Sequence, residues 1–539
     1  MSIPLEPYNL YTSDPVLRRS VEREGGGHAN SILDGFGERV GSIEVSEWGF
    51  QANRHSPELV THDRFGERVD EVRYHPSYHR LMDLSVGAGL HASHYDGQPG
   101  DGSYVARTAQ MHMISQIEVG HGCPVSMTGA VLPALREQPD LAAVWEPRVR
   151  TRSYDPRLVD PAAKSGNLLG MGLTEKQGGS DVRANTSEAV AVNRGGPGGE
   201  YRLTGHKWFT SAPMCDAFLM LAQARGGISC FLVPRILPDG ARNSLHLMRL
   251  KDKLGNRSNA SSELEYADAA GWLVGEEGRG INVIIKMVTA TRVDVTNWSA
   301  SLMRQGVSQA AWHVSQREAF GDLLIDKPLM QNVLADLELE TEVGTMMVMR
   351  LAGAYERAPV NEHDAVFLRL SSAVAKYWLS KRSTPVVREA LECVGGNGYV
   401  EESIMPRLYR EAPLNAIWEG AGNVIALDVL RALQRAPESG QAFLDELELA
   451  RGADRIYDTE LDQLRQLVTS PNLAERDARR LVERLAVCWG ASLCLRHEPS
   501  IADAYVRSRL DGDWGTEFGT LGSHVDVDLI ARRAIPNPK

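Results

Sequence analysis

The sequence predicts a mainly α-helical protein with a β domain in its middle. Two patterns support this fold class. Up to about residue 150 and after about residue 280, apolar residues recur every three or four positions, as they do on one face of a helix. Between these regions, short apolar or alternating runs are separated by turn residues, which is typical of an antiparallel sheet. The chain has 539 residues, 43% of them hydrophobic, so we expect two to four domains with substantial cores.

Composition narrows the class of protein further. Net charge is −12, which argues against a surface that is basic throughout, although a local patch could still bind a polyanion. Hydrophobic runs are broken well before the ~18 residues that a membrane helix needs, and the first residues lack the pattern of a signal peptide. The six cysteines show no paired spacing. We therefore expect a cytoplasmic protein with free thiols and no membrane contact.

The first domain is assigned to residues 1–167. Residues 1 to about 40 are polar and glycine-rich, with Glu24-Gly25-Gly26-Gly27 interrupting any helix, so an arm or irregular extension is expected there. Helical patterns dominate from there to about residue 150. His91 and His94 lie three residues apart but have no carboxylate or cysteine at a companion spacing. We expect solvated or hydrogen-bonded histidines and predict no metal site.

The β domain is assigned to residues 168–279. Four runs predict its strands, and none of them leads through a Gly-x-Gly-x-x-Gly turn into a helix, so Rossmann and P-loop nucleotide sites are not supported. These runs are Tyr201–Thr204, Phe218–Leu221, Ser229–Val233 and Ser262–Tyr266.

Long helices return in residues 280–437, and a smaller helical domain is assigned to residues 438–539. The first of these regions has three amphipathic stripes, and helices of that length favour a four-helix arrangement. The third stripe ends at Gly395-Gly396, a helix stop signal. The stripes start near Leu329, Phe367 and Val386.

One heptad, Ile417-Trp418-Glu419-Gly420-Ala421-Gly422-Asn423, places a single carboxylate between an aromatic and small residues. A glutamate among apolar side chains favours its neutral form and can exchange protons near neutral pH, as a general base must. A glutamate in the first turn of a helix, stabilised by the helix dipole, is the alternative interpretation. The heptad by itself favours this helix-start interpretation, so the case for a base depends on the rest of the chain.

Three further stretches are candidates for a binding site. Glycines, hydroxyls and amides of Met171–Asp181 are suited to a planar polar ring and its phosphates. The stretch Gly205–Ser211 places aromatic residues beside hydroxyls. The third candidate combines Gln316–Gly321 with Gly395–Tyr399. Each of these, taken singly, is also compatible with a tight turn or a core aromatic.

Taken together and in this order, these stretches resemble the acyl-CoA dehydrogenase family over roughly residues 165 to 433. The resemblance implies FAD bound without a Rossmann fold, a homotetramer whose subunits share each cofactor, and a carboxylate that removes the proton alpha to a thioester carbonyl. It makes Glu419 the base and Arg292 its catalytic neighbour. Some branches place the base just before that arginine, where this chain has Thr291. Arg317 and Phe320, with Gly395 and Gly396, would reach the cofactor of a neighbouring subunit. The remaining cofactor contacts would be Met171, Leu173, Thr174, Gly179, Ser180, Trp208, Phe209, Thr210, Ser211, Trp418, Gly420, Ala421 and Asn423.

Several positions depart from the family pattern. Lys176 stands where a proline is usual, Trp418 replaces a tyrosine, and Ala421 and Ala319 replace threonines, while Asn423 replaces a common Glu or Gln. These departures put the shape of the substrate in doubt more than the binding of the flavin.

In these departures and in its extra C-terminal helices, the chain resembles one branch of the family, the AidB-type flavoproteins of the bacterial adaptive response to DNA alkylation. That likeness implies binding of double-stranded DNA and protection against alkylation, with inactivation of alkylating agents as one route. Residues 441–539 carry 13 Lys or Arg against 17 Asp or Glu, so any DNA surface must be local. The predicted DNA contacts are Arg431 and a helix face formed by Arg476, Arg479, Arg480 and Arg484. A solvated face paired with Asp477 and Glu483 is the alternative.

Two other functions remain open at this stage. The chain could be a metabolic acyl-CoA dehydrogenase whose C-terminal helices are only structural. It could also be a scaffold that is stabilised by flavin and performs no turnover.

Overall fold

The computed structural model describes residues 3–470 and 473–537. The chain divides into two compact units, and each is described by itself below. Unit 1 comprises the residues up to 46, 97–117 and those from 292 onward, whereas unit 2 comprises 47–96 and 118–291. Two of the four divisions fall inside helices, α3 (Ile43–Arg54) and α8 (Gly280–Gln316). The four-domain division drawn from the sequence stays a prediction.

The centre of unit 2 is a closed ring of strands. β4 pairs with β5, β5 with β9, β9 with β7, and β7 with β6, while β6 meets β4 again through one residue pair. Because the ring closes, backbone N–H and C=O groups that would lie unpaired at a sheet edge find hydrogen-bond partners. β3 extends the ring at β6, and β8 extends it at β9. The strands are β3 (Leu169–Gly172), β4 (Glu188–Ala191), β5 (Glu200–Ser211), β6 (Ala217–Ala224), β7 (Gly227–Pro234), β8 (Leu245–Leu250) and β9 (Ser261–Val274).

The prediction of a purely antiparallel sheet is wrong for β6, which pairs in parallel with both β3 and β4. β3 runs parallel to β6, with Leu169 opposite Ala217 and Gly172 opposite Met220. An alternating or apolar run reports which face of a strand is buried, but not the direction of its partner. The four predicted runs do lie in β5, β6, β7 and β9.

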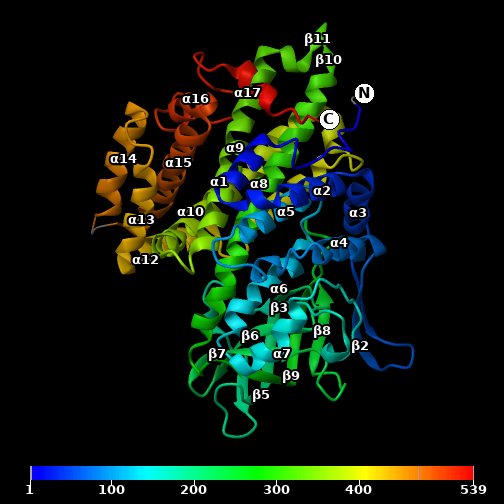
Figure 1. The fold of residues 1–539 in the computed structure, drawn as a ribbon. Helices are drawn as coiled ribbons and strands as arrows, with labels where there is room; N and C mark the ends of the chain where they lie inside the picture. Colours follow the sequence, from blue (N-terminus) through cyan, green and yellow to red (C-terminus); the bar gives the residue numbers. More distant parts are fainter. Residues whose placement is uncertain (1–2, 471–472, 538–539) are drawn as a thin grey trace. The chain divides into compact units, whose positions relative to one another are not determined.

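Helices and one hairpin complete unit 2 (Figure 1). α4 packs on α6, and α6 packs on β3. The hairpin was missed because the helical pattern dominates the sequence around it. His91 is buried and its Nε2 lies 2.9 Å from the Thr151 carbonyl, so it is hydrogen-bonded as expected. The elements are α4 (Pro76–Gly87), α6 (Gly122–Leu135), α7 (Pro139–Val149), β1 (Glu58–His62) and β2 (Arg68–Arg73).

Unit 1 is built on long helices. α9 packs along α10, and α10 packs on α12. α8 approaches α9 closely, because a Cβ on Gly344 would lie 3.0 Å from the terminal methyl of Met303. The four-helix arrangement expected from the sequence is therefore present. The elements that follow α8 are α9 (Pro328–Arg357), α10 (Glu362–Val394), α11 (Met405–Glu411) and α12 (Gly422–Arg435).

The second and third stripes form one helix rather than two. α10 starts where the Asn361 side chain accepts the Asp364 N–H, and it ends at Gly395, whose φ is 68°. Pro385 lies inside this helix without ending it. A proline inside a helix usually breaks or kinks it, so the surrounding helices hold α10 together against that tendency.

The expectation of an irregular N-terminal arm is wrong. Residues 15–40 form α1 (Pro15–Arg23) and α2 (Asn30–Val40), and Leu17, Val21 and Leu33 are buried. α1 packs on α9 and α2 packs on α5 (Ser103–Ile117). The glycine run does interrupt the helices as expected. The apolar positions outweigh the polar composition because they fall on one helix face.

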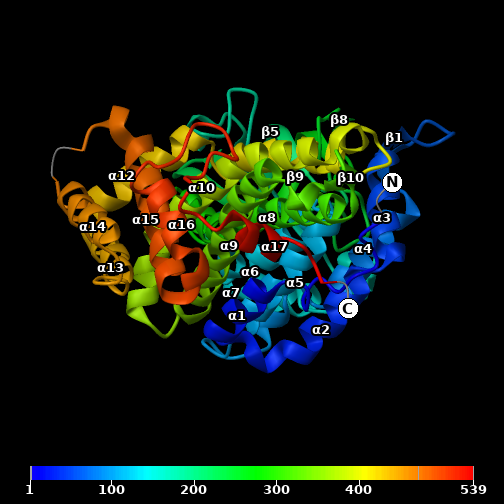
Figure 2. The ribbon, with the colours of Figure 1, turned by 90° about the horizontal axis from the view of Figure 1, so that it is seen from above.

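In the last part of unit 1, α13 to α16 form a helical layer beside α10 and α12, whereas α17 packs on α9 (Figure 2). α15 packs against α10 and α12 as well as against α14 and α16. Within the described ranges, no helix is long and apolar enough to cross a membrane. The helices are α13 (Pro437–Glu448), α14 (Arg455–Val468), α15 (Ala478–His497), α16 (Pro499–Arg509) and α17 (Val527–Arg533).

Candidate functional site

In unit 2, the segment after β3 lies against the end of β5. Thr174 forms an isolated antiparallel bridge with Phe209, and the Trp208 N–H donates to the Thr174 carbonyl at 2.8 Å. The ladder between β5 and β9 shifts register between Lys207 and Thr210. Such an irregularity turns side chains away from the regular alternation. The structure thus brings the first two predicted stretches together.

A buried ion pair holds these two segments in place. Lys207 Nζ lies 2.7 Å from Glu175 Oε1, and Glu175 also accepts hydrogen bonds from Ser187 and Thr186. Burial alone would raise the pKa of Glu175, but these donors outweigh it and lower the pKa to about 2. Glu175 is therefore an ionised structural group and not a candidate base.

The same region offers polar groups of the kind that a bound ring requires. Thr210 Oγ1 is buried and, among the described atoms, has no hydrogen-bond partner. It lies 3.0 Å from where a Cβ would stand on Gly172. A buried hydroxyl without a partner is costly unless a ligand satisfies it. Gly179 is also required, because a Cβ there would lie 2.4 Å from Thr174 Oγ1.

Three cations surround the ring of Trp208. Lys251 Nζ lies 3.3 Å from the ring centroid, and Lys176 and Arg249 lie 5.7 Å from it. Arg249 and Lys251 both pair with Glu263. Lys176, the departure from the usual proline, thus adds positive charge beside an aromatic platform. Phe209 is 48% exposed next to it.

In unit 1, Glu419 lies in a strained turn before α12. Its φ is 55°, and that of Gly420 is 101°. The helix begins at Gly422 with Ala421 as its N-cap, so Glu419 precedes the first turn, and the simple helix-start interpretation does not hold. Trp418 packs against Trp298 of α8, with ring centroids 5.5 Å apart. A non-glycine residue in the left-handed region persists only where its surroundings hold it there.

Sequence reasoning missed two charged groups, one in contact with this turn and one on the helix that follows it. Lys376 of α10 is buried, and its Nζ donates to the Gly420 carbonyl at 2.5 Å. Asp428 of α12 pairs with Arg292, whose Nη1 is 3.1 Å from Asp428 Oδ2. The only sequence signal for Lys376 was a lysine between Ala375 and Tyr377, in an apolar part of a helix. Arg292 and Glu419 are both close enough to act on the charge of Lys376, so these three residues form one charged group near the turn.

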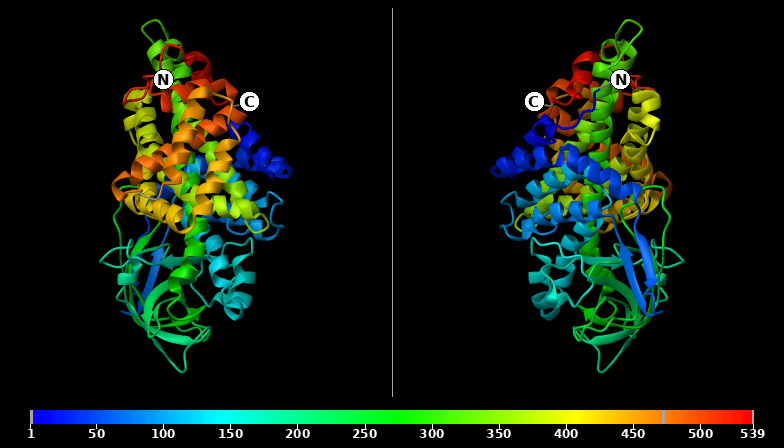
Figure 3. Two further views of the ribbon diagram at one scale, coloured as in Figure 1. Left: turned by 90° about the vertical axis from the view of Figure 1, so that its left-hand side faces the viewer. Right: turned by 90° about the vertical axis from the view of Figure 1, so that its right-hand side faces the viewer.

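Other predicted cofactor residues of unit 1 lie elsewhere. Arg317 and Phe320 are on the hairpin of β10 (Glu318–Ala319) and β11 (Asp322–Leu323), near α17 and away from α12 (Figures 1 and 3). Phe320 is 96% exposed, with φ 56°. Gly395 is 19 residues beyond Lys376 along α10, which corresponds to about 28 Å. Within one chain, unit 1 does not gather these residues around Glu419.

The predicted arginine face is only partly present. Arg479 and Arg480 are exposed on α15, and Arg431 is exposed on α12. Arg476 lies before α15, in a short 3₁₀ turn, 3.6 Å from Asp477. Arg484 turns toward α14 and binds both oxygens of Glu460. The single four-arginine face is thus a wrong prediction, because residue spacing does not reveal which side of α15 packs on α14.

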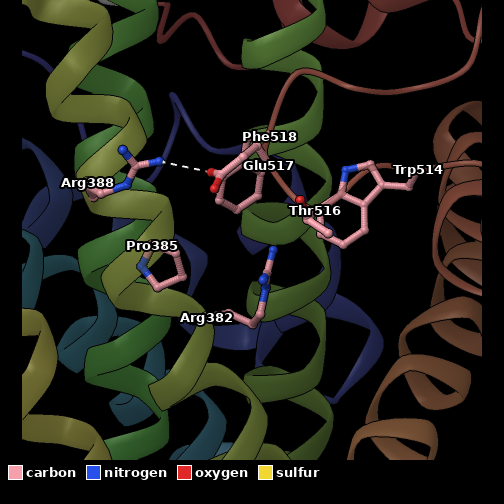
Figure 4. A pocket seen from close by; sticks show the side chains of 7 residues that line it. All are labelled: Arg382, Pro385, Arg388, Trp514, Thr516, Glu517 and Phe518. Carbon is pink, nitrogen blue, oxygen red and sulfur yellow. Dashed lines mark hydrogen bonds and ion pairs between the residues drawn. The ribbon is translucent and has the colours of Figure 1, made fainter.

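A separate pocket of about 380 Å³ lies between α10 and residues 514–518 (Figure 4). Arg382 lies near the rings of Trp378, Trp514 and Phe518, and it pairs with the buried Glu340. These contacts attach the C-terminal segment to α10. The residues that line this pocket include none of the predicted site residues.

Comparisons with known proteins agree with this arrangement. Family models match three ranges: the AidB N-terminal domain of adaptive response proteins over residues 1–156, and the middle and C-terminal domains of acyl-CoA dehydrogenases over 170–269 and 278–434. An Escherichia coli protein described as putative acyl-CoA dehydrogenase AidB is 42% identical over 98% of this chain and 96% of its own. The chain belongs to the acyl-CoA dehydrogenase family.

Two solved structures of the family are similar along the whole chain. Caenorhabditis elegans ACDH-11, solved in complex with C11-CoA, has a TM-score of 0.84 at 26% identity and covers 100% of this chain and 93% of its own. A Bacillus anthracis acyl-CoA dehydrogenase complexed with FAD has a TM-score of 0.64 at 16% identity, over 100% and 95% of the two chains. The second likeness concerns the fold alone.

Proposed function

We propose that this chain is an FAD-dependent oxidoreductase that acts on an acyl-CoA thioester, with Glu419 as the base. The observation that carries this proposal is the strained turn at Glu419, held beside Arg292 and Lys376. Strained backbone at a titratable residue is typical of functional sites. Membership of the family and the C11-CoA complex of ACDH-11 support it.

FAD is the cofactor that the family implies, and the residues of unit 2 suit it. The Thr210 hydroxyl needs a partner, and Trp208 and Phe209 offer aromatic surface beside it. Thr174, Gly179 and Ser180 form the loop next to them. When bound, FAD would supply an acceptor for the hydride that leaves the β carbon of the substrate.

The chain's own residues would prepare the substrate. Glu419 would remove the α proton, and its backbone N–H would polarise the thioester carbonyl. Asp428 would fix Arg292 at the edge of this site. The indole of Trp418, packed on Trp298, would narrow the acyl pocket compared with the family's usual tyrosine.

Assembly is the second part of the proposal. Phe320 is 96% exposed on a small hairpin, and its apolar ring would be stabilised if a second subunit covered it. We infer a homotetramer in which Arg317 and Phe320 reach the cofactor of a neighbouring subunit, together with Gly395 and Gly396. An arginine suits the diphosphate because its planar group pairs with two oxygens at once.

Anaerobic mixing of the FAD-loaded protein with acyl-CoA thioesters of increasing chain length tests the dehydrogenase proposal. A substrate bleaches the flavin, and Glu419→Gln should slow bleaching at least ~100-fold, as loss of a general base does. Undiminished bleaching in Glu419→Gln would overturn the role of the base. A panel with no bleaching at all would overturn the dehydrogenase proposal.

A second function rests on a different observation. Arg431, Arg479 and Arg480 are exposed on the neighbouring helices α12 and α15. Such cations can neutralise phosphates. The name of the E. coli relative and of the N-terminal domain model links the chain to the adaptive response. We propose that this face binds double-stranded DNA and that the protein protects DNA against alkylation.

Fluorescence anisotropy with a short labelled duplex at several salt concentrations tests DNA binding. Replacing Arg431, Arg479 and Arg480 by Gln should weaken binding and lower the salt slope by roughly 3, about one for each phosphate that is no longer neutralised. Arg484→Gln is the matched control, because Arg484 is engaged by Glu460. An equal loss of affinity in the control would reject the proposed face.

A further inference from the structure

Lys376 stands out among the charged groups that the proposed mechanism does not use. It lies in the middle of α10 and is 1% exposed. Lysines are rarely buried this deeply unless a partner compensates the charge. The hydrogen-bond acceptor described for its ammonium group is the neutral carbonyl of Gly420, at 2.5 Å. A structural role for α10 alone would be served better by an apolar side chain of similar volume.

The accepting carbonyl belongs to the turn that presents Glu419. Glu419 and Gly420 are consecutive residues with positive φ, and the first of them carries a side chain. Such a conformation costs a non-glycine residue about 1–3 kcal/mol. Ile425 packs against Gly420, where a Cβ would lie 2.8 Å from its Cδ1. The Lys376 hydrogen bond and this packing hold the turn from two sides.

Charge also couples Lys376 to Glu419. Burial lowers the pKa of Lys376 to about 7, repulsion from Arg292 and Lys381 adds to this shift, and attraction to Glu419 opposes it. These groups come from α8, from α10 and from the turn. Asp428 and Arg369 surround Arg292 and offset part of its charge.

We propose that Lys376 is a positioning residue for Glu419: its ammonium group fixes the Glu419–Gly420 turn and favours the ionised carboxylate that can accept a proton. This inference rests on the proposed role of Glu419 as the base. It adds that the competence of the base depends on a cation supplied by a different helix. Because Lys376 touches the peptide next to the base, it acts through Glu419 and not on the substrate.

Three variants separate the contribution of the Lys376 charge from that of its hydrogen bond. Lys376→Met removes both charge and hydrogen bond, Lys376→Gln keeps a donor without charge, and Lys376→Arg keeps the charge. Arg388→Met is the matched control, because it removes an exposed cation from the same helix that pairs with Glu389 and Glu392 and does not act on Lys376. Retention of FAD and the thermal midpoint are measured first, so that folding is known for each variant. If Lys376→Met does not fold, Lys376→Gln replaces it in every comparison.

The first measurement follows exchange of the α protons of a bound acyl-CoA with deuterium oxide, by NMR, across pH. Lys376→Met and Lys376→Gln should slow exchange at least ~10-fold at neutral pH and move the acidic limb of the profile upward by about one pH unit. Lys376→Arg should restore the acidic limb to its wild-type position, and Arg388→Met should leave it unchanged. The inference would be overturned if Lys376→Gln exchanged the α protons at the wild-type rate and kept the acidic limb of the pH profile at its wild-type position.

The second measurement needs no substrate. Infrared difference titration of each protein against its own Glu419→Gln variant isolates the carboxyl band of Glu419. The midpoint of that band should rise when Lys376 loses its charge, and an unchanged midpoint would reject the coupling. Absence of α-proton exchange in the wild-type protein would instead reject the proposed function, so the two failures are distinguishable.

Discussion

Arg292 and Asp428 form an ion pair between α8 and α12, with Arg292 Nη1 3.1 Å from Asp428 Oδ2. Arg369 of α10 binds the other oxygen of the same carboxylate at 2.8 Å. Burial would raise the pKa of Asp428, but the two arginines outweigh burial and lower it. One carboxylate therefore joins α8, α10 and α12, and it fixes the position of the Arg292 guanidinium.

Asp428→Asn should loosen this junction. The change leaves two partly buried arginines without their carboxylate, which typically costs about 1–3 kcal/mol. Because the folded pKa is depressed, the stabilisation is present above the unfolded pKa of about 4 and is lost as pH falls through the folded value. Urea unfolding at neutral and acidic pH measures this difference. Asp445→Asn is the control, since Asp445 is exposed and pairs with no arginine; it accepts from the Gln441 amide, and His363 lies 3.9 Å away. An equal loss of stability there would contradict the prediction.

Lys207→Met should destabilise unit 2 and weaken FAD retention. The change leaves the buried carboxylate of Glu175 without its cation, and breaking a buried pair in this way costs roughly 3–5 kcal/mol. The affected segments carry Thr174 and Trp208. Arg202→Met, on the same strand, is the control, because its pair with Glu200 is exposed and contributes about 0–1 kcal/mol. Thermal unfolding and fluorescence of released flavin check both parts. Equal losses of thermal stability and of bound flavin in the two variants would show that burial of the Lys207–Glu175 pair adds nothing to its contribution.

The sequence was sufficient to predict the fold class and to select the two stretches of unit 2 that lie side by side. Periodicity located the long helices, and the paired stretches around Thr174 and Trp208 do lie side by side. Spacing could not show that Arg484 faces Glu460, because the packing of α15 on α14 is a tertiary property. Lys376 and Asp428 are 43 and 9 residues from Glu419 in the sequence, so only the packing of α10 and α12 reveals that they share a site.

Phe320→Ala should leave the isolated subunit as stable as before but weaken its assembly. A side chain that is 96% exposed contributes little to the folding of its own chain, within about 0.5 kcal/mol. Loss of an aromatic anchor from an interface typically costs 2 kcal/mol or more, about a 30-fold change in the dissociation constant. Analytical ultracentrifugation over a dilution series should therefore show smaller species at higher concentration than for the wild-type protein. Phe65→Ala serves as the control, because Phe65 is 73% exposed on the loop between β1 and β2. An unchanged dissociation curve for Phe320→Ala would reject the hairpin as an interface.

Lys376 also predicts an unusual dependence of stability on pH. Its folded pKa of about 7 lies below the ordinary value of 10.5, so between these values the unfolded chain binds a proton that the folded chain releases. Stability from this group is therefore complete above about pH 10.5 and is lost as pH falls through about 7. Lys376→Met removes the titrating group, and its free energy of unfolding should rise less with pH over this range than that of the wild-type protein. Denaturant titrations at several pH values give the slope directly. Arg388→Met keeps the buried lysine and should retain the wild-type slope. Identical slopes for the wild type and Lys376→Met would show that burial does not lower the pKa of Lys376 in the folded protein.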